Sequence, residues 1–351
     1  MNAASPNTLQ IVKGTPYGNS DAEYIVVSYS WTPTPRLERD RNGGYAVTGA
    51  RGGHRRKSIV RDEVLERVIR YANHIGIFRL WIDKECSPQE DLVEKQTAMD
   101  SMDLVYRQSR HPVGLLAVVF DDQSEANYLQ TLMMGGSVVQ RNEYEYPKLF
   151  YSVTSSTSLG IFNVLVHLYE GRWWTRAWIL QEEYLSSTAM QILVRRKQGI
   201  RARQMYGFVH GEKCLNAVDF HKQATLFLLA FKRQSQCGRA KKCLRMLKRF
   251  GRCELQYHFQ HDARRKAMSP RIFADIQRRG LENPFDRLPI VVECSELGEG
   301  AGQLERIAGG AMRWEPNNKV EFEVSKTEIL VFSRRRKVLR AAKEAVFRIE
   351  E

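Results

Sequence analysis

Apolar residues in the first part of the chain alternate between short continuous runs and longer segments in which they recur with a helical period. The continuous runs are rich in β-branched and aromatic residues and predict four strands, over residues 24–30, 78–83, 112–120 and 190–194. The periodic segments predict amphipathic helices over 58–75, starting at an N-cap Ser58, and over 91–108. Because continuous apolar strands need cover on both faces, the pattern predicts a doubly wound α/β fold with one mainly parallel sheet.

The alternation breaks between residues 121 and 171, where a Gly-Gly pair and a Ser/Thr-rich stretch predict an insertion with one or two helices. A helical pattern resumes at Gly171, ahead of the fourth strand. From 196 onward the pattern is helical and basic, and the last part of the chain mixes a loop, the short strands EFEV and ILVF, and a helix from about residue 334. We therefore expect a flexible tail over 1–20, a main domain over 21–195, a basic helical region over 196–280 and a C-terminal extension over 281–351.

The formal charge of +14 is concentrated in one segment. Residues 195–280 hold 22 Lys and Arg against 5 Asp and Glu, a net of +17, so the rest of the chain is slightly acidic. Such a segment could bind nucleic acid, an anionic membrane or an acidic protein, but a solvated Arg-rich helical face is the favoured interpretation. No nucleic-acid-binding motif accompanies the charge, which disfavours nucleic acid as the partner.

Composition limits the class of protein. A hydrophobic content of 43% is typical of a folded globular chain. The N-terminus has no apolar core of signal-peptide length, and the longest apolar run, ATLFLLAF, is too short to cross a bilayer, so we expect a cytoplasmic protein with no transmembrane segment. The six cysteines lack the Cys-x-x-Cys spacing of zinc sites, so free thiols and no bound metal are expected.

Three stretches, in this order, resemble the heterokaryon incompatibility (HET) domain of filamentous fungi. They are YIVVSYSW at 24–31, LWIDKECSPQEDLVEKQTAMDSMDLVYRQS at 80–109 and WWTRAWILQEEYL at 173–185, and NPFDRLPIVVEC at 283–294 is similar to a segment that often follows one group of these domains. Ser87-Pro88 and Thr32 depart from the family pattern in loops. The resemblance implies a module of fungal non-self recognition that assembles with like or unlike protein partners.

HET domains are distantly similar to Toll/interleukin-receptor (TIR) domains, some of which cleave the nicotinamide–ribose bond of NAD. Those enzymes use a glutamate in a W-x-x-x-E helix, and Trp178 and Glu182 match that pattern just before the fourth strand. The resemblance therefore implies a TIR/flavodoxin-like sheet, NAD as a substrate and Glu182 as the catalytic residue. A module with the same fold and no chemistry, acting only by assembly, is the alternative.

Helical spacing places Trp174, Trp178 and Glu182 on one predicted face and turns Glu183 toward solvent. Burial against aromatic rings would raise the pKa of Glu182, and its carboxylate would stabilise the positive charge that develops as a glycosidic bond breaks. The structural alternative is that Glu182 pairs with Arg176 or Arg172 and orders the core. The sequence leaves both open.

Polar side chains follow the first two predicted strands, and ligands bind outside the carboxyl ends of parallel strands. Trp31 would stack on a nucleotide ring, or Trp31 and Tyr29 would close the edge of the sheet. Acidic residues from Asp83 to Glu94 would be solvated rather than hold Mg²⁺. The residues expected to bind the nucleotide are Ser28, Tyr29, Trp31, Asp83, Trp178 and Arg176.

Overall fold

The computed structural model describes residues 7–10, 23–31, 44–48, 55–86, 102–140, 146–186, 189–201, 209–235 and 237–250, and every structural statement below concerns these residues. All four predicted strands form and belong to one sheet, which confirms the central prediction from the hydrophobic pattern. They are β2 (Ile25–Tyr29), β5 (Leu80–Ile82), β6 (His111–Phe120) and β9 (Gln191–Arg196). The predicted C-terminal strands and helix lie outside the described residues.

The sheet has five strands in the order β10-β9-β6-β2-β5. Strands β5, β2, β6 and β9 are parallel, and the edge strand β10 (Glu212–Asn216) is antiparallel to β9. The chain passes from β2 to β5 on one side and then returns past β2 to β6 on the other. The connections therefore reverse direction at β2, and in open α/β sheets ligands bind at the carboxyl ends of the strands beside such a reversal, here β2 and β6.

One face of the sheet is covered by α1 (Asp62–Ile75), which packs its apolar stripe on alternate residues of β2 such as Ile25 and Val27. The predicted start at Ser58 was four residues early, because Arg61 is still extended, with φ −61° and ψ 138°. The Ser58 hydroxyl instead donates to Glu85 and accepts from the Val60 amide. The helix ends at Gly76, whose φ of 74° is the left-handed conformation that glycine adopts most easily.

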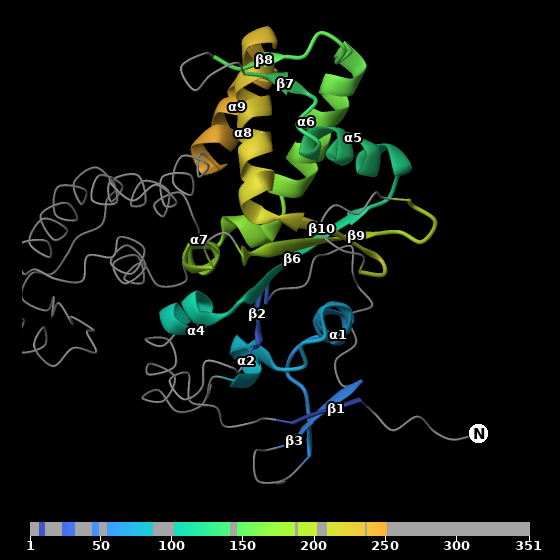
Figure 1. Ribbon diagram of the computed structural model, residues 1–351, viewed down its shortest axis with the longest axis vertical. Coiled ribbons are helices and arrows are strands. Elements are labelled where there is room, and N and C mark those ends of the chain that lie inside the picture. The colour runs from blue at the N-terminus through green and yellow to red at the C-terminus, as the bar shows by residue number, and fades with distance from the viewer. Residues whose placement is uncertain are drawn as a thin grey trace, which may run out of the picture.

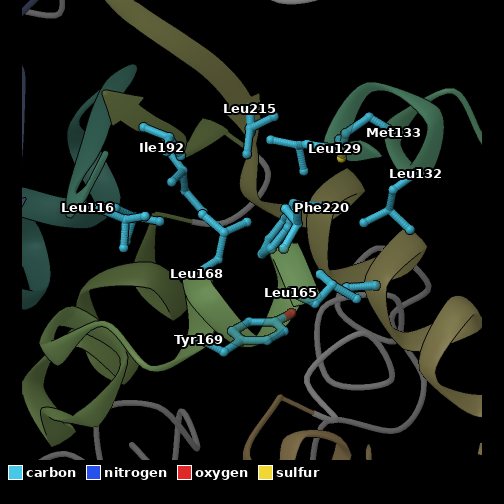
Figure 2. Packing of buried hydrophobic residues seen from close by; sticks show 14 of the residues in the cluster. Leu116, Leu129, Leu132, Met133, Leu165, Leu168, Tyr169, Ile192, Leu215 and Phe220 are labelled. Atoms are coloured by element: carbon cyan, nitrogen blue, oxygen red, sulfur yellow. The ribbon is translucent and has the colours of Figure 1, made fainter. Parts of the chain in front are cut away.

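The other face of the sheet carries a large helical cluster on β6, β9 and β10 (Figure 1). It contains α5 (Gln123–Met133) and α6 (Ser155–Tyr169), which are the helices predicted in the insertion, together with α8 (Ala217–Gln234) and α9 (Cys237–Phe250). Figure 2 shows leucines of α5 and α6 meeting Phe220 of α8 and Ile192 of β9. The described part of the basic region thus contributes β10 to the sheet and two helices to the core.

The remaining part of that face, over β2 and β5, is covered by α4 (Met102–Gln108) and α7 (Ala177–Leu185). Residues 102–108 confirm the end of the predicted second helix, and the rest of it lies outside the described residues. The continuous helix predicted from Gly171 is wrong. A 3-10 helix, η1 (Arg172–Thr175), precedes α7, and Arg176 between them is extended, with φ −84° and ψ 136°. No glycine or proline marks this break.

Two small sheets lie outside the main one. The first joins β1 (Asn7–Gln10), within the predicted flexible tail, to β3 (Tyr45–Thr48) and β4 (Arg56–Lys57). The second pairs β7 (Val138–Val139) with β8 (Lys148–Leu149). Among the described helices, none combines the length and the apolar character needed to cross a membrane.

Candidate functional site

The carboxyl ends of β2 and β5 bring the predicted polar residues together. Trp31, just beyond β2, donates its indole N–H to Oδ2 of Asp83, just beyond β5, over 2.6 Å. The Trp31 side chain is partly exposed, and two cations approach its ring: Lys84 Nζ lies 4.8 Å from the ring centroid and the Arg176 guanidinium carbon 5.8 Å. An aromatic ring, a carboxylate and two positive charges therefore meet at one rim of the sheet.

Arg176 reaches this rim because of the break between η1 and α7. One of its terminal nitrogens donates to the backbone carbonyl of Tyr29, the last residue of β2, over 2.7 Å. Its positive charge lowers the pKa values of both Asp83 and Glu182. The extended backbone at Arg176 thus brings a guanidinium near enough to influence two acidic side chains that come from separate elements.

Glu182 is buried, with 5% of its surface exposed. Burial is the largest influence on this carboxyl and raises its pKa from 4.5 to about 7, while Arg176 and the hydroxyls of Ser28 and Tyr106 oppose the rise. Its Oε2 atom has no hydrogen-bond partner among the described residues. A carboxyl with a pKa of about 7 is about half ionised at neutral pH, which suits a group that takes part in a reaction.

Asp83 is a second acidic group with a perturbed pKa. Burial raises its pKa, and hydrogen bonds from the Lys84 amide and the Trp31 indole, together with the Arg176 charge, lower it. Asp83 also raises the pKa of Glu182 by charge repulsion. The two carboxyls therefore titrate under each other's influence, with Arg176 close to both.

Ser28 lies on the face of β2 beneath α7, opposite Gly114 of β6. Its hydroxyl oxygen accepts a hydrogen bond from the indole N–H of Trp173 over 2.9 Å, and both side chains are buried. A Cβ atom on Gly114 would come within 2.7 Å of the Trp173 ring, so only glycine leaves room for the indole at this place. Sequence reasoning missed Trp173 and Gly114, because their pairing with Ser28 appears only once the register of β2 and β6 is known.

We call the group that the structure brings together the strand-exit site. Of the predicted residues only Trp178 has no described contact with the others, and its side chain is partly buried. Trp174 does not share a helical face with Glu182 as predicted, because it belongs to η1 and packs against Tyr169 and Phe220 in the helical cluster. The strand-exit site consists of Ser28, Tyr29, Trp31, Asp83, Arg176 and Glu182.

Glu183 was predicted to face solvent, and this is wrong. Its side chain is buried, and its Oε1 atom is hydrogen-bonded to Nε2 of His221 on α8. The prediction failed because α7 lies between α4 on one side and α8 on the other, so two adjacent residues both face protein. His221 comes 38 positions later in the chain, and nothing in the local sequence indicates it.

The acidic stretch after β5 gives no metal site in the described residues. Glu85 accepts hydrogen bonds from Arg56, Ser58 and the Ile59 amide, so it joins β4 and the start of α1 to the end of β5. The other acidic residues of that stretch, Glu90 to Glu94, lie outside the described residues. In the described part of the chain, no three His, Cys, Asp or Glu side chains are placed together so that they could hold a metal ion.

Comparison with protein-family models matches residues 24–182 to the family described as Heterokaryon incompatibility protein (HET). The match begins just before β2 and ends at Glu182, so it spans every residue of the strand-exit site. No curated protein and no solved structure matches the chain.

Proposed function

We propose that this protein acts in fungal non-self recognition, because its residues 24–182 match the heterokaryon incompatibility family, and that its strand-exit site cleaves NAD. The recognition role rests on the match to a family whose description is heterokaryon incompatibility. The NAD glycohydrolase activity rests on the distant resemblance to TIR enzymes and on the site itself. The observation that carries it is a buried Glu182, with its raised pKa, beside Ser28 and Arg176 at the carboxyl ends of parallel strands.

The proposed reaction breaks the bond between ribose C1′ and the nicotinamide nitrogen. Nicotinamide leaves with the bonding electrons as a neutral molecule, the ribose becomes an oxocarbenium-like cation, and water adds to give ADP-ribose and a proton. Ionised Glu182 stabilises that developing cation in surroundings of low dielectric constant, where a charge acts strongly. The reaction needs no metal, and each atom of the products comes from NAD and water.

The other residues of the site bind and orient in this proposal. Trp31 offers a partly exposed indole face to a nucleotide ring, and Lys84 beside it offers a charge to phosphate. Arg176, fixed to the Tyr29 carbonyl, keeps a share of Glu182 ionised near neutral pH by lowering its pKa against the effect of burial. Asp83 holds the Trp31 ring through the indole N–H.

A specific observation favours a second candidate, a recognition module without chemistry. Glu182 is only 5% exposed, so substrate reaches it only if the residues above it move. In an assembly-only module the same buried carboxyl would have a purely structural role. In an enzyme, assembly with a second copy or the binding of NAD would open the site.

The test is NAD turnover by the purified full-length protein at high concentration, compared with Glu182→Gln. Glutamine keeps the size of the side chain and removes its charge, so a catalytic Glu182 predicts a loss of about two or more powers of ten. Glu66→Gln, on the exposed side of α1, is the matched control and should keep full activity. A folded Glu182→Gln protein with unchanged turnover contradicts the catalytic role, and an inactive wild type favours the assembly-only module.

A further inference from the structure

The buried indole of Trp173 has no role in the proposed reaction, yet its polar atom points at the strand-exit site. Its side chain is fully buried, and its N–H donates to the Ser28 hydroxyl oxygen over 2.9 Å. The ring also packs edge-on against Trp174, with 4.6 Å between centroids, and lies over Gly114. The indole is therefore held in one position, and its hydrogen bond has a fixed direction.

Donor and acceptor chemistry decides what this bond does to Ser28. An indole N–H can only donate, so the Ser28 oxygen must accept from it and uses one of its lone pairs. The single hydrogen of that hydroxyl stays available for an acceptor. An ionised carboxylate can only accept, and Glu182, whose pKa the Ser28 hydroxyl lowers, is the carboxylate next to it.

We propose that Trp173 is a positioning residue for Glu182, whose indole N–H holds the Ser28 hydroxyl so that its hydrogen is directed at the carboxylate. The ionised form of Glu182 then has a fixed donor in a buried place, and successive hydrogen bonds in such a chain strengthen one another. The other charged or titratable groups near Glu182 are Arg176 before α7, Asp83 after β5 and Tyr106 on α4. None of them depends on Trp173 for a hydrogen bond in the described structure.

The catalytic consequence rests on the proposed NAD cleavage, but the arrangement is tested without substrate. The measurement is the titration midpoint of the Glu182 carboxyl carbon by nuclear magnetic resonance, in the wild type and in Trp173→Phe. Loss of the indole N–H frees the hydroxyl to turn away, so the midpoint should rise by about half to one pH unit. Trp174→Phe removes an equally buried indole from the same 3-10 helix and is the control, with an expected change below about 0.2 pH unit.

A double substitution separates orientation from packing. In a Ser28→Ala background the midpoint is already raised, and adding Trp173→Phe should change it by less than about 0.2 pH unit, because the group through which Trp173 acts is absent. An equal rise in both backgrounds would overturn the proposal and assign the effect to altered burial. An unchanged midpoint in Trp173→Phe alone would also overturn it.

A second measurement needs no substitution of Trp173, in case Trp173→Phe does not fold. The indole N–H resonance of Trp173 in the native protein should shift with pH around a midpoint near 7, in step with Glu182, and lose that shift in Glu182→Gln. A Trp173 resonance that is insensitive to pH overturns the proposal. Absence of NAD cleavage leaves these midpoints unaffected, so failure of the proposed function is distinguished from failure of the positioning role.

Discussion

Glu182 and Glu183 are adjacent on α7 and both are buried, yet they lie in two different regions of the molecule. Glu183 points into the helical cluster and is paired with His221 of α8. Glu182 points into the strand-exit site, where Oε2 has no hydrogen-bond partner among the described residues and burial raises the pKa to about 7. The hydrogen bond to His221 offsets the cost of burying Glu183, whereas a buried carboxyl with an oxygen that lacks a partner costs stability and is retained for another reason.

The largest effect should come from breaking the pair in the helical cluster. His221→Ala removes the hydrogen bond to Glu183 and leaves a cavity where the buried imidazole was, at a cost of about 3–5 kcal/mol in the free energy of unfolding. Chemical denaturation followed by circular dichroism measures this. Asp121→Ala is the control, because it removes an exposed ion pair with Lys197 that should contribute less than about 1 kcal/mol. A loss below about 1 kcal/mol in His221→Ala would mean that the two regions do not differ.

The substitution Glu182→Gln should instead increase the free energy of unfolding. A carboxyl whose folded pKa lies above its unfolded value binds more protons in the native state, so its contribution favours folding at low pH and is lost as pH rises toward 7. The rise from 4.5 to about 7 corresponds to a cost on the order of 3 kcal/mol at pH 8. Glutamine avoids that cost, so Glu182→Gln should be more stable than wild type at pH 8 by up to this amount.

The same linkage fixes how that difference changes with pH. Unfolding measured at pH 8, 7, 6 and 5 should show the advantage of Glu182→Gln shrinking as the wild-type carboxyl becomes protonated, with little left near pH 4.5. If Glu182→Gln is less stable than wild type at pH 8, Glu182 is a structural partner of Arg176. Its role would then be to stabilise the fold, as the role of Glu183 is. In that case the contrast between the two residues does not hold.

Activity should follow the ionisation of Glu182. The charged carboxylate is the form that stabilises the ribose cation, so NAD cleavage should rise about tenfold between pH 6 and pH 8, with a midpoint near 7. Initial rates at saturating NAD measure this dependence. Any residual cleavage by Glu182→Gln should not show this rise between pH 6 and pH 8. A wild-type rate that falls over the same range would mean that the protonated form acts, as a general acid.

The smallest effect is expected at the exposed rim. Trp31→Phe keeps an aromatic ring and removes the N–H that bonds Asp83, and because Trp31 is partly exposed the stability should change by less than about 1 kcal/mol. The dissociation constant for NAD, measured by calorimetry in the Glu182→Gln background to prevent turnover, should increase by about two- to tenfold. Trp81→Phe, on β5, is a control that leaves the rim intact. Unchanged affinity in Trp31→Phe would exclude the ring from the binding site.

Sequence patterns could predict the sheet because its strands are almost wholly apolar and their ends are polar. The same reasoning missed β10, whose sequence EKCLN begins with two charged residues. Both are buried: Glu212 accepts from Arg67 of α1 at 2.8 Å, and Lys213 donates to Gln130 of α5 at 2.9 Å. A charged residue is compatible with a buried strand when its partner is supplied by a distant element, and one sequence does not reveal that partner.

The site could be predicted only in part, for a similar reason. The polar residues after each strand were identifiable because parallel strands end at one edge, and their side chains do meet there. The helix break at Arg176 and the indole of Trp173 could not be predicted, because both depend on atoms of β2 that only the folded chain brings near. The orientation of Glu183 depends in the same way on α8.

The order of the strands has a practical consequence for anyone who shortens this protein. The family match stops at residue 182, before β9 and β10, so a chain cut there would retain β6 paired with β2 and lose β9, which pairs with its other edge. β6 is ten residues long and nearly all apolar, and its free backbone amides and carbonyls would recruit the same strand from another molecule. Such a fragment should precipitate, whereas a chain that continues through Phe250 keeps every described strand paired.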